Sequence, residues 1–319
     1  MIHFLSYMNR SGSTLLAKKL NTIRDISVGI EINIGSKIRN NFKAENDEEL
    51  EYWLQKVYRD VKFQSWNIEI NKLKKNLLSK KKPIFFRDFL EESLKMYFSN
   101  SDSKILIHKS KYYFRRIDVA NKVFPGSKFV FIERDPRAIF NSMSKSINSI
   151  TGKVMKEDVI KFALHYKRLQ SRKKHFVKSK KFSDLILSIN YEDLLVQEDF
   201  VLKKISDFFG VSDKKETHTD YFDKIPEDQK HLHSNLNREN MTERITAWKN
   251  ELDDTDADFL NLVLRKELKE KGYETTSSLN LKILFRIVLI NKYIRFLIRF
   301  YPKHIAKEIL MFLNQREVY

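Results

Sequence analysis

The stretch YMNRSGSTLL, residues 7–16, holds the strongest local signal in the chain. The apolar residues before it, 2–7, predict a buried strand, and residues 14–20 predict a helix. The turn between them contains Gly12. Backbone N–H groups at a helix start point outward and carry the positive end of the helix dipole. A strand, a tight glycine turn and a helix in this order therefore predict a phosphate-binding loop.

The side chains of this loop strengthen the prediction. Ser13 and Thr14 add hydroxyl donors, and Arg10 adds a charged fork. A serine-rich cap on an ordinary helix explains the hydroxyls, but it does not explain Arg10 beside Gly12. Ser13 stands where a loop that hydrolyses nucleoside triphosphates carries its lysine. The loop therefore disfavours cleavage of ATP or GTP.

A second motif, FVFIERDPRAIFNSM, covers residues 129–143. Its apolar half predicts a strand over 128–132, and Pro136 opens a helix predicted over 137–147. Arg134 ends the strand, and Ser142 follows about two helical turns later. Ligands of open parallel sheets sit at the strand ends, so these two side chains can converge on one phosphate. The alternative is a surface cluster of salt bridges within this charged segment.

Strands and helices alternate along most of the chain. Further strands are predicted over 26–30, 104–107 and 185–189, and further helices over 113–123, 191–196 and 198–209. Residues 36–100 are mostly helical by pattern. The alternation predicts an α/β fold: a central parallel sheet flanked by helices, with a P-loop-like nucleotide-binding core and helical elaborations.

Composition narrows the function. The 319 residues contain 60 Lys and Arg against 42 Asp and Glu, a net charge of +18, which favours anionic partners. The alternative is a coding bias toward lysine. The absence of cysteine excludes disulfides and thiol catalysis. No signal peptide and no membrane-spanning apolar run are found, so cytoplasmic residence is expected.

Together the two motifs resemble the sulfotransferases that use 3′-phosphoadenylyl sulfate (PAPS). That family carries an R-S-G-[ST]-T-L-L loop and an R-D-P-R-A-x-x-x-S segment, which residues 10–16 and 134–142 match in the same order. Weaker similarities are IHKS at 107–110, YEDL at 191–194, RITAW at 244–248 and LKEKGY at 268–273. The resemblance runs discontinuously from about residue 2 to residue 275.

The resemblance implies roles for the donor-binding residues. The loop would bind the 5′-phosphate and sulfonate of PAPS through Arg10, Ser11, Gly12, Ser13, Thr14 and Leu15. Arg134 and Ser142 would bind the 3′-phosphate, and Tyr191 would lie along the nucleotide. The resemblance also implies that the product nucleotide would be adenosine 3′,5′-bisphosphate (PAP), and that no metal would be required, because Arg, Lys and backbone amides would meet the sulfonate charge.

Two further residues are implied in catalysis. Glu31 follows the second strand, where relatives that act on tyrosylproteins and glycans carry a catalytic Glu, so it is expected to be the base. Lys109 is expected to stabilise the leaving group. The alternatives are an exposed loop carboxylate and a solvated lysine at a strand end. Ser110 departs from the Thr or Asp of the family, and no Pro follows it.

These expectations give a domain plan. Residues 1–275 form the sulfotransferase domain, and 36–100 are a helical insertion on its acceptor side. Residues 279–319 form a basic amphipathic helical extension, with Lys292, Arg295 and Arg299 on one face. The extension binds an anionic membrane surface at the inner face, or packs on the main domain or on a second subunit as a homodimer.

The expected acceptor is a hydroxyl of a glycan or glycolipid, and an anionic polysaccharide suits the basic charge. Two other functions stay open. A P-loop kinase of a small metabolite would want a lysine at position 13 and an acidic Mg²⁺ ligand. A basic membrane- or nucleic-acid-binding protein without catalysis would leave the Arg10 and Arg134 motifs unexplained. No nucleic-acid-binding module is recognised, so no nucleic-acid partner is expected.

Overall fold

A computed structural model describes residues 1–32, 41–99, 101–111, 116–147, 152–155, 158–216 and 242–275. The chain forms two compact units. The first comprises residues 1–133 and 184–239, and the second comprises residues 134–183 and 240–319. Each unit is described by itself below.

The first unit is built on a five-stranded sheet in the order β2-β5-β1-β6-β7, and every pairing in it is parallel. The strands are β1 (Ile2–Tyr7), β2 (Ile26–Gly29), β5 (Ile105–Lys109), β6 (Phe129–Glu133) and β7 (Ile186–Asn190). All residues of β1 and β6 are buried, as expected for central strands covered on both faces. The predicted α/β fold with a parallel sheet is confirmed.

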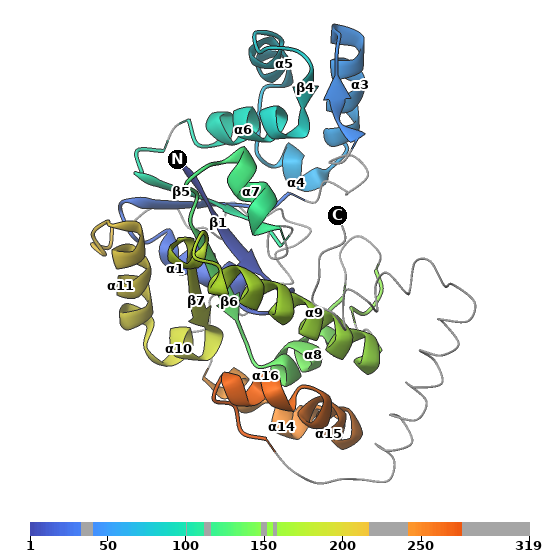
Figure 1. The fold of residues 1–319 in the computed structure, drawn as a ribbon, viewed down its shortest axis with the longest axis vertical. Helices are drawn as coiled ribbons and strands as arrows, with labels where there is room; N and C mark the ends of the chain where they lie inside the picture. Colours follow the sequence, from blue (N-terminus) through green and yellow to red (C-terminus); the bar gives the residue numbers. More distant parts are fainter. Residues whose placement is uncertain are drawn as a thin grey trace, which may run out of the picture. The chain divides into compact units, whose positions relative to one another are not determined.

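Helices flank this sheet (Figure 1). α1 (Ser13–Leu20) packs against β1 and β2, and α10 (Tyr191–Val196) and α11 (Glu198–Phe209) pack against β7. A short helix, α7 (Ile117–Val123), precedes β6. The first residues predicted for that helix, 113–115, lie outside the described residues. The arrangement brings the carboxyl ends of all five strands to one edge of the sheet.

The segment between β2 and β5 is a compact lobe of the first unit. It contains a two-stranded hairpin, β3 (Lys43–Ala44) with β4 (Ile84–Phe85), which the sequence did not predict. Its helices are α3 (Asp47–Val57), α4 (Val61–Gln64), α5 (Ile70–Leu78) and α6 (Phe86–Tyr97). Figure 1 shows α3, α5 and α6 gathered about the hairpin. Phe42, Phe63 and Phe89 fill their common core.

The second unit is helical. Its described helices are α8 (Pro136–Ser144), α9 (Val159–Lys178), α13 (Glu243–Thr246), α14 (Trp248–Glu251), α15 (Asp254–Val263) and α16 (Arg265–Glu270). α8 contacts α9, α13, α14 and α15. A 3-10 helix over Ser183–Leu185 leads into β7.

Several element boundaries differ from the prediction. β5 runs on to Lys109, so this lysine ends a strand rather than following one. α8 ends at Ser144, earlier than predicted, and Ile147 instead forms an isolated bridge to Val154. Among the residues that the structure describes, no helix combines the length and apolar character needed to cross a membrane.

Candidate active site

The loop between β1 and α1 has the backbone geometry of an anion site at a helix start. Gly12 caps α1 with a left-handed φ of 90°, and no side chain in the described ranges caps this helix. Arg10 is also left-handed, with a φ of 66°. The N–H of Ser11 donates to the carbonyl of Met8 over 3.2 Å, which closes the turn. N–H groups in the first turn of a helix have no intrahelical acceptor, so they are available to an anion.

Tyr191 packs directly on this loop. It is the first residue of α10, where the chain leaves β7, and it is buried. A Cβ placed on Gly12 would lie 2.1 Å from Cδ2 of Tyr191 and 2.5 Å from its Cε2. Position 12 therefore requires glycine for two reasons, the backbone angle and the aromatic ring. The structure thus brings together two of the predicted nucleotide-binding positions.

Buried hydroxyls in and before the loop fit an oxygen-rich ligand. The Oγ of Ser11 and the phenol oxygen of Tyr7 are buried, and neither has a hydrogen-bond partner among the residues described. A buried hydroxyl without a partner is costly. A phosphate or sulfate oxygen is an acceptor that such a donor can use. Leu15 packs in the core, so its contribution to a ligand is limited to its backbone.

Lys109 reaches the loop from the end of the neighbouring strand β5. Its Nζ donates to Oγ1 of Thr14 over 2.9 Å and lies 5.2 Å from the ring centroid of Tyr7. The side chains of Lys109 and Thr14 are both buried. Burial lowers the pKa of Lys109 to about 8, although Glu31 acts in the opposite direction. The ammonium group is thus held in the first turn of α1, and it is not the solvated strand-end lysine of the alternative interpretation.

Glu31 lies two residues past β2 and makes an ion pair with Lys62 of α4. Its side chain is only 17% exposed, so the alternative of an exposed loop carboxylate is wrong. Burial alone would raise the pKa of Glu31, but the positive charges of Lys109, Lys62 and Lys111 outweigh burial and lower it to about 2. The carboxylate is therefore ionised at neutral pH. Glu31 thus interacts with the ammonium groups of Lys62 and Lys109, and that of Lys109 contacts the loop.

The remaining predicted site residues, Arg134 and Ser142, belong to the second unit. Arg134 is buried, and its Nη2 donates to the carbonyl of Arg244 over 2.9 Å. Ser142 lies in α8, where its carbonyl accepts from Oγ of Ser146 over 2.7 Å. Arg134 is thus held to the start of α13, within the segment that contains Trp248.

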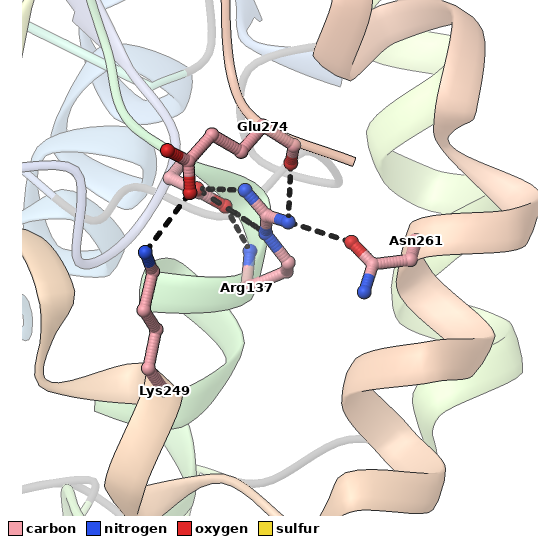
Figure 2. Close-up of polar contacts among 5 residues, drawn as sticks. Arg137, Lys249, Asn261 and Glu274 are labelled. Atoms are coloured by element: carbon pink, nitrogen blue, oxygen red, sulfur yellow. Dashed lines mark hydrogen bonds and ion pairs between the residues drawn. The ribbon is translucent and has the colours of Figure 1, made fainter. Parts of the chain in front are cut away.

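A buried network around Arg137 organises this unit (Figure 2). Arg137 makes an ion pair of 2.6 Å with Asp135, and both side chains are almost fully buried. The same guanidinium donates to Oδ1 of Asn261 over 2.6 Å and to the carbonyl of Glu274 over 2.8 Å. It also lies 4.0 Å from the ring centroid of Trp248. The charged segment is therefore no surface cluster, because its ion pair is part of the core.

Two residues of evident structural importance were not predicted for the site. Lys62 contacts Glu31 from α4 of the lobe, and Arg137 ties α8 to α15 and to residue 274. No sequence signal marks Lys62, which is one lysine among many in a basic chain. Arg137 lies inside the R-D-P-R segment, so the sequence motif marks this residue. The motif does not indicate that its side chain is buried in an ion pair. The predicted extension over 279–319 lies outside the described residues.

The chain is similar in sequence to one protein family and in fold to several solved structures. The family described as "Sulfotransferase family" matches residues 4–215 of the chain. The fold is similar to the sulfotransferase domain from the curacin biosynthetic pathway, with 18% identity over 86% of this chain and 98% of that one, at a TM-score of 0.55. It is also similar to the sulfotransferase domain of the Synechococcus PCC 7002 olefin synthase, with 18% identity, coverages of 86% and 95%, and a TM-score of 0.52.

A further solved structure with similarity to the chain is mouse sulfotransferase SULT7A1 complexed with PAP, with 13% identity, coverages of 84% and 84%, and a TM-score of 0.44. No curated protein matched the sequence of the chain.

Proposed function

The chain belongs to the sulfotransferase family, whose match spans residues 4–215, and from this premise we propose that it transfers the sulfuryl group of PAPS to an acceptor hydroxyl and leaves PAP. The observation that carries the proposal is the hydrogen bond from Lys109 to Thr14 in the helix-start loop, with Glu31 close to the same lysine. One unit thus holds an anion-binding loop, a buried cation and a carboxylate. Sulfuryl transfer needs these three elements.

The residues named in the two sequence motifs would hold the donor. Backbone N–H groups of the loop, with Arg10, Ser11, Ser13 and Thr14, would bind the 5′-phosphosulfate. The ring of Tyr191, which already packs on Gly12, would lie along the nucleotide. Arg134 and Ser142 would bind the 3′-phosphate. Support for the loop comes from its left-handed residues and from the hydroxyl of Ser11.

The chain's own residues have separate tasks in the reaction. When bound, PAPS supplies the sulfuryl group and a phosphate leaving group. Glu31 would accept the proton of the acceptor hydroxyl. Lys109, held by Thr14, would donate a hydrogen bond to the oxygen on which negative charge develops as the donor S–O bond breaks.

The low pKa of Glu31 has a consequence for this role. The carboxylate is ionised across the neutral range, so the form that accepts a proton is always present. It is a weak base, however, and a free alcohol does not yield its proton to it. Proton transfer is therefore expected late, after the new O–S bond has begun to form and the hydroxyl proton has become acidic.

We propose a glycan or glycolipid hydroxyl as the acceptor. Support comes from the charge of the chain, which is +18 overall, because such a field attracts anionic polymers and raises their local concentration. The test is transfer of ³⁵S from labelled PAPS to acidic polysaccharides, compared with neutral sugars and phenols. Labelling of the phenols alone would overturn this choice of acceptor.

The donor assignment is tested by thermal denaturation with PAP, with ADP and ATP as controls. A ligand at about a hundred times its dissociation constant adds about 2.7 kcal/mol to the free energy of unfolding, which raises the melting temperature visibly. The expected result is a rise with PAP alone, because ADP and ATP lack the 3′-phosphate.

Two variants make this experiment specific. Arg134→Ala should abolish the rise with PAP, whereas Arg265→Ala, an exposed arginine of α16 in the same unit, should retain it. An equal rise with ADP, or a full rise in Arg134→Ala, would contradict the 3′-phosphate assignment.

A further inference from the structure

The lobe between β2 and β5 supplies a charged side chain that contacts Glu31. Lys62, in the short helix α4, makes its ion pair with Oε1 of Glu31, and the two side chains are only 13% and 17% exposed. We propose that Lys62 is a positioning residue for sulfuryl transfer, which holds the Glu31 carboxylate from the insertion while Lys109 holds the donor loop. This inference rests on the proposed function, because Glu31 is its catalytic base.

The position of Lys62 is set by the folded core. The side chain of Asp60 accepts from the N–H of Phe63 over 2.8 Å and so caps α4. Phe63 is buried, with its ring centroid 5.8 Å from that of Trp66 and 5.4 Å from that of Phe89. α4 is therefore fixed on the lobe, although it has only one turn.

The same lobe also holds the residue before Glu31. Trp66 donates from Nε1 to the carbonyl of Ile30 over 3.2 Å, and the hydroxyl of Tyr97 accepts from the N–H of Ile30 over 3.4 Å. The rings of Trp66 and Tyr97 lie 4.6 Å apart. Both partners of the ion pair are thus anchored to one cluster of aromatic side chains. The pair is a built feature of the fold.

Other ion pairs of the insertion provide a contrast. Lys74 pairs with Glu51 at 2.5 Å, and Lys82 pairs with Asp47 at 2.9 Å, but these side chains are between 32% and 63% exposed. Exposed pairs couple weakly because water screens them. The pair of Lys62 and Glu31 is mostly withdrawn from water, so its two charges interact more strongly.

Lys62 also leaves one oxygen of the base available. In the part of the chain that the structure describes, the side-chain hydrogen bond to Glu31 comes from Lys62 and ends on Oε1. Oε2 is then the atom on which an acceptor hydroxyl can place its proton. Without Lys62 the carboxylate can rotate, so fewer encounters present an oxygen to the acceptor.

Lys62 affects the pKa values of two neighbouring groups, Glu31 and Lys109. The groups that act on Glu31 are Lys62 from α4, with Lys109 and Lys111 from β5 and the residues after it, while His108 of β5 feels the charge of Glu31. Lys62 lowers the pKa of Glu31 and also the pKa of Lys109. Removal of its charge should therefore raise both pKa values together. A residue with a purely structural role has no reason to do this.

The experiment compares Lys62→Met and Lys62→Arg with wild-type protein by ¹³C NMR titration of glutamate carboxyl and lysine Cε signals. Glu31→Gln and Lys109→Met assign the two signals by their loss. In Lys62→Met, Lys109 should titrate at higher pH than in wild-type protein, and Glu31 should begin to titrate while the wild-type carboxylate is still ionised. A rise of at least about one pH unit is expected at Glu31. Lys62→Arg should keep both values low.

Activity provides the second readout, with PAP release from PAPS measured against pH and with water as the acceptor. Lys62→Met should lower kcat about tenfold to a hundredfold, leave the KM for PAPS within about twofold, and move both limbs of the profile to higher pH. Lys62→Arg should recover most of the rate. Lys74→Met, the matched control in α5, should behave as wild-type protein.

The outcomes separate this inference from the proposed function. If the titrations of Glu31 and Lys109 are the same in Lys62→Met as in wild-type protein, the inference is wrong, whatever the activity. An unchanged pH profile and kcat in Lys62→Met would also overturn it. If wild-type protein neither binds PAP nor releases it from PAPS, the proposed function fails, and the positioning role fails with it even where the titrations shift.

Discussion

The ring of Tyr191 occupies the space that a side chain on Gly12 would need, with Cδ2 of the ring 2.1 Å from the place of the missing Cβ. Two segments far apart in sequence, the turn after β1 and the start of α10, therefore constrain each other's position. The left-handed turn at Gly12 remains closed only while residue 12 is glycine.

Gly12→Ala is expected to lower the free energy of unfolding by about 1 to 3 kcal/mol through backbone strain, and by more through overlap with Tyr191. It should also abolish PAP binding. Urea denaturation measures the first effect and calorimetry the second. Gly210→Ala is the matched control, because Gly210 has a φ of 75° with nothing within 4 Å of a Cβ. An equal decrease in the free energy of unfolding in the two variants would mean that the ring of Tyr191 does not constrain the loop.

Glu31→Gln should lower PAP formation by about two to four orders of magnitude, because it removes the proton acceptor. PAP binding should stay near the wild-type value, since Glu31 pairs with Lys62 and is not part of the loop. Turnover is measured as PAP released from PAPS by anion-exchange chromatography. Glu51→Gln, at the exposed partner of Lys74, is the control. Full activity in Glu31→Gln would remove this residue from the mechanism.

Arg137→Met should destabilise the second unit by about 3 to 5 kcal/mol, because it leaves Asp135 buried without its counter-ion. Lys145→Met breaks an ion pair with Glu251 that is far more exposed, so its cost should not exceed about 1 kcal/mol. Arg137→Lys keeps the charge but loses the planar fork that reaches Asn261, and it should fall between the two. Urea denaturation gives all three values. Similar stabilities for all three would refute a core role for Arg137.

Acid should destabilise the first unit in two stages. Burial lowers the pKa of His3 and of His108 from 6.5 to about 4, so between these pH values the unfolded chain binds more protons than the folded one. As the pH is lowered through this range, the free energy of unfolding decreases by up to about 1.4 kcal/mol for each histidine and each pH unit. Glu31, with its pKa lowered from 4.5 to about 2, adds a further loss between those values.

His108→Phe tests the first stage. Phenylalanine keeps the ring contacts to Phe4 and Trp66 but cannot take up a proton. Urea denaturation between pH 7 and pH 5 should therefore show a shallower loss of stability in this variant than in wild-type protein. A loss of unchanged slope would show that His108 does not contribute.

Local patterns predicted the structure of the loop between β1 and α1 well. The order of strand, glycine turn and helix over residues 2–20 needs only neighbouring residues, and the structure confirms it. The apolar run of β6 and the proline that opens α8 are equally local. Parallel strands end at one edge of a sheet, so the proximity of Lys109 to the loop also followed from the fold class.

The contacts of Lys62 and Arg137 depended on parts of the chain that no local pattern contains. Lys62 meets Glu31 because aromatic side chains of the lobe hold α4 and residue 30 together. The burial of Arg137 depends on Asn261 and Glu274, which lie far along the chain. The β3–β4 hairpin was missed because two-residue strands have too few residues to show a period.

The order of strands in the sheet has a consequence for how the chain folds. β1 precedes both of its partners, β5 and β6, along the chain, so the centre of the sheet cannot assemble until β6 has been synthesised. Pairing of distant strands slows folding because a long loop must close first. The lobe between β2 and β5 shortens this loop, since its helices and hairpin contact one another. The segment that carries Lys62 to Glu31 would thus also act as a compact spacer that brings β2 and β5 within reach of each other.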